Sequence, residues 1–190
     1  MTMTPVRFWS ALICLTLTSS CSFVRAPSVE ELALLKNPPD EVRRIQEQYT
    51  PLAMQWFADV EENYINKGRL LSEGEITMAH AIGVNSPHQV RVVVLAQFPL
   101  PQNETLRAKA ITYGVGSSAE GGRTIGYVIM LKEKYAQERW ILAHELTHVA
   151  QQEQMGREAF ISRLIAEREL MGYRRAPLEL DANKRALEFM

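Results

Sequence analysis

One stretch of the sequence, from Glu138 to Gly156 (ERWILAHELTHVAQQEQMG), restricts the possible folds more than any other. It carries His144, Glu145 and His148 in the pattern HExxH, and the residues directly around them are uncharged. On an α-helix, residues four apart lie one turn apart on the same face, and the uncharged surroundings predict that this turn is buried. Because two histidines and a glutamate are costly to bury without partners, the fold must bring polar groups or a metal ion to them.

Length and charge narrow the class of protein. The chain has 190 residues, which is enough for one domain with a core and short for two. Hydrophobic residues make up 46% and charged residues 23%, as in ordinary globular proteins. The formal net charge is −1 and no long basic run is present, so nothing in the sequence supports binding to nucleic acid.

Residues 1–20 have the plan of a secretory signal peptide, with one positive charge at Arg7, a short apolar run and then small residues. The apolar run is roughly half of the ~20 residues that span a bilayer. The segment LTSSC resembles a bacterial lipobox, in which the lipidated cysteine, here Cys21, becomes the mature N-terminus, although Thr18 stands where leucine is usual. We therefore predict an exported lipoprotein, anchored by Cys21 on the periplasmic side of a bacterial envelope. Simple secretion, and an uncleaved anchor or a cytosolic start, are the alternatives.

The two cysteines, Cys14 and Cys21, both fall in this N-terminal region. The predicted mature domain then contains no free thiol, no disulfide and no cysteine ligand. Any metal ion must be held by histidines and carboxylates.

The remaining sequence predicts a short tether (residues 22–27) and one domain (residues 28–190). Ser28 with Glu31, and Ser72 with Glu75, have the spacing of capping boxes that start helices. The order of helices, then strands, then helices favours an α+β fold, mostly helical, with a small sheet of two to three strands packed on the HExxH helix. Helices are predicted over 28–37, 40–67 (broken or kinked near Pro51), 72–83, part of 100–114, 136–154, 156–171 and 177–189, and strands over 89–98 and 123–131.

A catalytic zinc site keeps three protein ligands and leaves a fourth position open. His144 and His148 supply two, and we expect the third from a second helix in the segment APLELDANKRA. Pro177 suits the first position of that helix, so Glu179 would lie in its first turn. The rival ligand on the same helix is Asp181. Two histidines elsewhere, His80 and His88, are further alternatives.

HELTH followed at a distance by PLELDA resembles the gluzincin class of zinc metallopeptidases. From about Arg91 onward, the chain also resembles small bacterial HExxH proteins and the peptidase-like domain attached to contractile-injection-system toxins. The resemblance implies a zincin-like domain with one Zn²⁺ per chain. It implies His144, His148 and Glu179 as metal ligands and Glu145 as general base. One position departs from the pattern: Asn183 stands where many gluzincins have an aspartate that orients a ligand histidine.

The predicted function is hydrolysis of peptide (amide) bonds by a metal-activated water, in a monomeric zinc metallopeptidase acting on a peptide or a cell-wall peptide. Tyr173 is predicted to stabilise the developing oxyanion, with Tyr113 and Tyr127 as competitors. An extended substrate would pair with an edge strand, for which the segment TIGYVIML is the candidate. Two alternatives stay open: a metal-binding but inactive zincin-like domain that serves as a binding or structural lipoprotein of the envelope, and a helical lipoprotein in which HELTH is coincidental.

Overall fold

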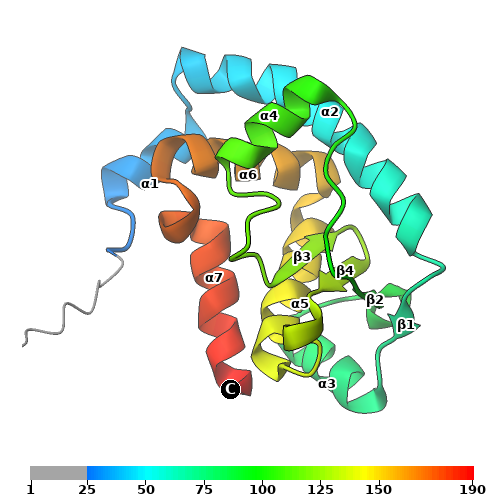
Figure 1. Ribbon diagram of the computed structural model, residues 1–190. Helices are drawn as coiled ribbons and strands as arrows, with labels where there is room; N and C mark the ends of the chain where they lie inside the picture. The colour runs from blue at the N-terminus through cyan, green and yellow to red at the C-terminus, as the bar shows by residue number, and fades with distance from the viewer. Residues whose placement is uncertain (1–24) are drawn as a thin grey trace, which may run out of the picture.

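The computed structural model describes residues 25–190, and the predicted signal peptide and Cys21 lie outside this range. The described part contains seven α-helices and four short strands (Figure 1). The helices are α1 (Val29–Lys36), α2 (Asp40–Tyr64), α3 (Glu73–Ile82), α4 (Glu104–Thr112), α5 (Arg139–Met155), α6 (Arg157–Met171) and α7 (Pro177–Ala186). The strands are β1 (Arg69–Leu70), β2 (Arg91–Val94), β3 (Gly122–Ile125) and β4 (Val128–Leu131). The predicted α+β class is confirmed.

The four strands form one mixed sheet in the order β1-β2-β4-β3. Strands β2 and β4 are parallel, and the outer pairs β1–β2 and β3–β4 are antiparallel. The sheet has one strand more than the two to three that the sequence predicted. The segment predicted as one strand over 123–131 is a hairpin, because Gly126 adopts a positive φ of 58°, which reverses the chain between β3 and β4. Strand β3 is therefore an edge of the sheet.

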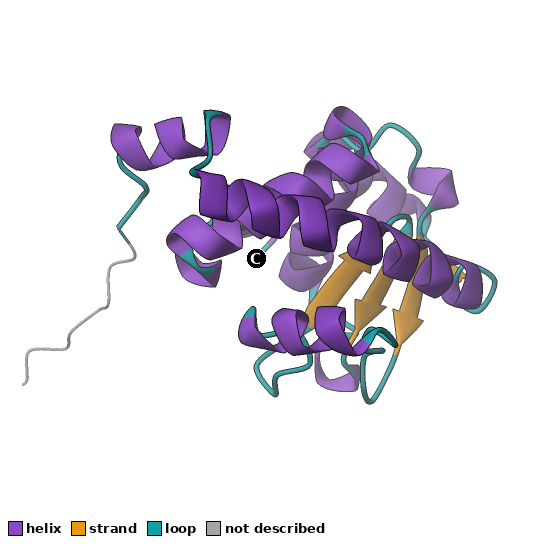
Figure 2. Ribbon diagram, turned by 90° about the horizontal axis from the view of Figure 1, so that it is seen from above, coloured by secondary structure: helices purple, strands orange, loops and turns teal. Residues whose placement is uncertain are grey.

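Both faces of the sheet are covered by helices (Figure 2). Successive residues of a strand point to opposite faces, and β4 shows the consequence. Ile129 and Leu131 pack into a cluster with α3 and α5, whereas Val128 and Met130 pack into a second cluster with α2 and α6. All four residues of β4 are almost completely buried. The central strand thus separates two hydrophobic cores.

The helix boundaries agree closely with the local sequence signals. Both predicted capping boxes are formed, at Ser28 before α1 and at Ser72 before α3. Gly83 ends α3 in the left-handed conformation, which glycine adopts without strain. Pro51 lies inside α2, which continues to Tyr64. Helix α5 is the central element: every residue from Ile141 to Gln152 is buried, with α7, β3, α3 and α6 around it.

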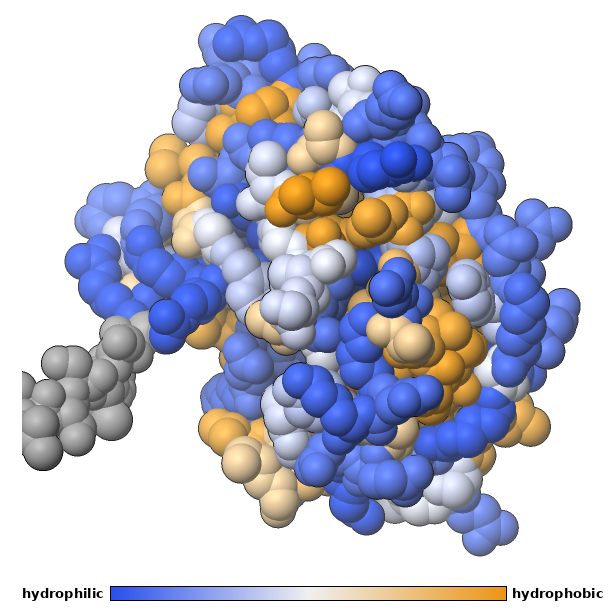
Figure 3. Space-filling view, in the orientation of Figure 1, coloured by the Kyte–Doolittle hydropathy of each residue, from blue (hydrophilic) through white to orange (hydrophobic). Residues whose placement is uncertain are grey.

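Polar residues dominate the face of the molecule drawn in Figure 3, and apolar residues appear there in separate patches. Within residues 25–190, no helix has the length and apolar character that crossing a bilayer requires.

Candidate metal centre

The histidines of HELTH lie one turn apart in the buried middle of α5. Both residues are nearly inaccessible, with His144 8% and His148 9% exposed. The two Nε2 atoms are 3.1 Å apart, and the rings meet edge to face. Both Nε2 atoms therefore point at one place beside the helix, as the spacing of the histidines predicts.

Helix α7 brings a carboxylate to the same place. It begins at Pro177, whose fixed φ suits the first helical position. The buried Glu167 of α6 accepts a hydrogen bond of 2.8 Å from the backbone N–H of Leu178, which satisfies one of the unpaired amides of the first turn. These contacts place Glu179, 4% exposed, over the HExxH turn of α5.

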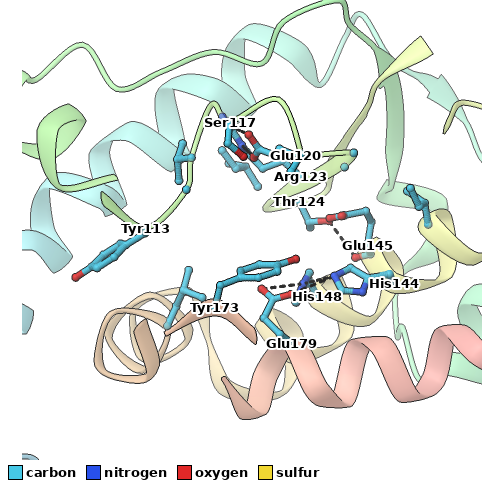
Figure 4. Close-up of a pocket in the computed structure, with 18 of the residues that line it drawn as sticks. Tyr113, Ser117, Glu120, Arg123, Thr124, His144, Glu145, His148, Tyr173 and Glu179 are labelled. Atoms are coloured by element: carbon cyan, nitrogen blue, oxygen red, sulfur yellow. Dashed lines mark hydrogen bonds and ion pairs between the residues drawn. The ribbon is translucent and has the colours of Figure 1, made fainter. Parts of the chain in front are cut away.

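Together the three side chains form a compact buried group (Figure 4). Glu179 Oε2 is 3.3 Å from His144 Nε2, and Glu179 Oε1 is 3.7 Å from His148 Nε2. One ligand atom from each residue can be chosen so that all three lie within 4.8 Å of one another. Glu179 Oε2 is buried and makes no well-formed hydrogen bond, and such an atom costs free energy unless a cation or a proton occupies the space before it. His144, His148 and Glu179, the metal-binding group, could therefore bind a metal ion.

The charges of the group are strongly coupled. Burial alone would lower the pKa of His148, but the carboxylates of Glu179 and Glu145 outweigh it and raise that pKa to about 9. Burial would raise the pKa of Glu179, but the positive charges of His148 and Arg168 and the polar contacts of both histidines hold it well below its usual range. Without a metal ion, a proton therefore balances the buried carboxylate. A metal ion would have to displace that proton, so the affinity of the group for a metal ion is expected to fall as the pH is lowered.

Arg168 is a member of the site that the sequence did not predict. Its guanidinium Nη2 donates to Glu179 Oε1 at 2.8 Å and lies against the ring of Tyr173, with 4.3 Å between the guanidinium carbon and the ring centroid. This ion pair holds one carboxylate oxygen and leaves Oε2 facing the histidines. No local signal distinguishes an arginine inside α6 from a solvated one, because its partner lies on another helix.

Glu145 is oriented by the edge strand and not by the metal-binding group. The hydroxyl of Thr124, on β3, donates a hydrogen bond of 2.7 Å to Glu145 Oε2. Burial raises the pKa of the Glu145 carboxyl, although the nearby histidines oppose that effect. A carboxylate with a raised pKa, held beside a metal-binding group without belonging to it, is suited to accept a proton.

Gly122 is required because β3 passes directly over Glu145. A Cβ atom at this position would lie 2.5 Å from Glu145 Oε1 and 2.9 Å from its Cδ and Cγ. We expect Gly122→Ala to lower the free energy of unfolding by about 1–3 kcal/mol, the usual cost of overpacking, as measured by denaturant unfolding. Gly74 is the matched control, since a Cβ there meets nothing within 4 Å. Gly74→Ala is expected to be neutral or stabilising by up to about 1 kcal/mol. Equal effects at the two positions would contradict the packing argument.

The three predicted tyrosines lie in different surroundings. Tyr173 lines the same cavity as the metal-binding group, and Figure 4 shows its hydroxyl directed toward His148 and Glu179. Desolvation and the charges of Glu179 and Glu145 raise its pKa, so the hydroxyl remains a hydrogen-bond donor. Tyr113 also lines the cavity, but its hydroxyl donates to Glu169 at 2.6 Å. The hydroxyl of Tyr127 donates to Glu153.

The alternative ligands lie apart from the group. His80 and His88 are exposed, on α3 and on a short 3₁₀ turn before β2. Asp181 accepts hydrogen bonds from Gln151 and Arg185 and is not part of the group. Among the described residues, the side chains that come together as potential metal ligands are therefore His144, His148 and Glu179.

A cavity of about 550 Å³ opens onto the group, a size typical of ligand sites. Apolar and aromatic side chains make up much of its wall, and β3 contributes all four of its residues. The residues from other elements include Trp56, Phe57, Trp140, Ile141, Phe160, Leu164, Arg168, Tyr173 and Asn183. Glu145, Thr124 and the metal-binding group thus share one accessible space.

Part of the chain matches a known family model. No curated protein and no solved structure matches the chain. A family model described as the eCIS core domain matches residues 118–156. The matched segment contains the β3–β4 hairpin and α5, and hence His144, Glu145 and His148, but it ends before Glu179. Over this segment the chain is similar to the eCIS core domain.

Proposed function

We propose that this protein is a zinc-dependent hydrolase that cleaves peptide (amide) bonds. The observation that carries the proposal is the buried group of two imidazoles and one carboxylate, with the unpaired Oε2 of Glu179. Catalytic zinc sites use this donor set and keep a further position open. A zinc ion bound there would supply Lewis acidity and a water of lowered pKa.

The protein's own residues provide the remaining steps. Glu145, fixed by Thr124, takes a proton from the attacking water and passes it to the leaving amine. The hydroxyl of Tyr173 donates a hydrogen bond to the oxygen on which negative charge develops. An extended peptide would pair with the edge strand β3, whose four residues line the cavity that contains the metal-binding group.

A second candidate is a metal-binding domain without catalytic activity that binds a protein or cell-wall partner. Asn183 favours it, because a neutral amide stands where the resemblance implies an aspartate. In either case we place the protein in a bacterial envelope, as an exported, monomeric lipoprotein anchored through Cys21.

Removal of the metal tests the proposal. We expect the purified protein to contain about one zinc per chain, and a chelator to remove hydrolysis of fluorescent casein or of purified cell-wall peptides. Adding zinc should restore hydrolysis. Since zinc binds the folded chain, saturation at about 100 times its Kd should stabilise the fold by about 2.7 kcal/mol, measured as a rise in Tm. Hydrolysis that persists in the metal-free protein would contradict the proposal. Zinc uptake without hydrolysis of any substrate would favour the second candidate.

A further inference from the structure

Gln151 connects the metal-binding group to helix α7. It lies on α5, three residues after His148, and is 6% exposed. Its Oε1 is 2.9 Å from His148 Nδ1. On the other side, its Nε2 donates to the backbone oxygen of Leu178 at 3.1 Å and to Asp181 Oδ2 at 3.0 Å. Every polar atom of this buried amide therefore has a partner.

These partners determine which ring nitrogen of His148 carries a proton. A backbone oxygen and a carboxylate can only accept hydrogen bonds, so the amide nitrogen of Gln151 must face them and its oxygen must face the ring. Nδ1 is then the donor. In the neutral ring, Nε2 is left with its lone pair, and Nε2 is the atom that faces His144 and Glu179.

The amide is itself held in place. Asp181 Oδ1 accepts from Arg185 Nε at 3.0 Å, and Arg185 Nη1 donates to the backbone oxygen of Ile82, at the end of α3, at 2.7 Å. The orientation of His148 is thus linked through side chains to α7 and to α3. A ligand histidine that donates its second N–H to a fixed acceptor keeps its tautomer and ring angle and becomes a more basic ligand.

We propose that Gln151 is the positioning residue of the metal centre, and that Asp181 acts through it. The proposal rests on the metal binding inferred above. In many gluzincins, the resemblance implies, an aspartate orients a ligand histidine, and this chain has Asn183 at that position. Here Gln151 orients His148 instead. Asp181, considered from sequence as a rival ligand, fixes the amide that orients a ligand.

Zinc affinity of the full-length protein tests this role by competition with a chromogenic chelator. Gln151→Leu, which cannot accept a hydrogen bond, is expected to weaken zinc binding about 10–100-fold, as loss of outer-shell partners does elsewhere. The matched control is Gln152→Leu. Gln152 is equally buried on the same helix, but it contacts the backbone oxygen of His148 and the backbone N–H of Gly126. This control should bind zinc within about threefold of the wild type, because the ring keeps its partner.

A spectroscopic measurement separates orientation from folding. In ¹H–¹⁵N spectra of the zinc-loaded wild type, His148 should bind zinc through Nε2 and carry a slowly exchanging proton on Nδ1. That proton should exchange quickly in Gln151→Leu.

Three results would overturn the role of Gln151 alone: unchanged affinity in Gln151→Leu, an equal loss in Gln152→Leu, or zinc bound through Nδ1 of His148. A wild-type protein that takes up no zinc would overturn both this role and the proposed function. The two failures are therefore distinguishable.

Discussion

Replacing Glu145 with glutamine is expected to lower the rate of peptide hydrolysis about 10²–10⁴-fold, the usual contribution of a general base, while zinc content stays at one per chain. The amide has the same size, and its oxygen can still accept the hydrogen bond that Thr124 donates to Glu145. The substitution therefore removes the proton acceptor and little else. The measurement is the initial rate on the substrate that the wild type cleaves, with elemental analysis of the same preparations.

Glu153 provides the control for this experiment. It lies two turns further along α5 and accepts hydrogen bonds from the backbone N–H groups of Asn85 and Ser86, away from the cavity. Glu153→Gln changes the same chemical group on the same helix and should retain the wild-type rate. A Glu145→Gln protein that hydrolyses within about tenfold of the wild type would remove Glu145 from the mechanism. Loss of zinc in that variant would make Glu145 part of the metal site instead.

The second large effect is expected at Glu179. Glu179→Ala removes the one carboxylate of the metal-binding group. Loss of a residue that only orients a ligand costs roughly 10–100-fold in metal affinity, and loss of the ligand itself should weaken zinc binding by more than that. His148→Ala should lose zinc to a similar extent. Competition with a chelator measures both. Zinc retained at wild-type affinity in Glu179→Ala would show that another residue completes the ligand set.

The same substitution should also lower stability, for a separate reason. It leaves Arg168 buried without its ion-pair partner, and breaking a buried pair in this way costs about 3–5 kcal/mol. The double variant Glu179→Leu with Arg168→Met replaces the pair by apolar groups. It is expected to recover the stability, seen by denaturant unfolding, without recovering zinc. A double variant as unstable as Glu179→Ala would contradict this separation of metal binding from folding.

Much of this centre could be predicted from sequence because its signals are local. The spacing of four positions from His144 to His148 places both rings on one side of a helix, whatever packs against it. Pro177 marks the start of α7 and so the turn that carries Glu179. The capping boxes at Ser28 and Ser72 likewise depend only on residues three positions apart.

The parts that could not be predicted depend on contacts between distant segments. Arg168 and Gln151 resemble ordinary polar helix residues until α7 packs beside them. Thr124 gains its role only because β3 lies over α5. The sequence did not predict the turn at Gly126, because apolar residues lie on both sides of it. The pattern of the two short strands is therefore typical of one longer strand.

The ligand atoms come from the central helix and from the last helix of the fold, with α6 between them along the chain. An ion bound by both would join the ends of a long loop, as a covalent cross-link does, and would remove conformations from the unfolded chain. Separation of α7 from α5 would leave the ion on two histidines, so this local opening would speed the release of the ion. Exchange of the amide protons of α7 would then report a motion that also affects the residence time of zinc.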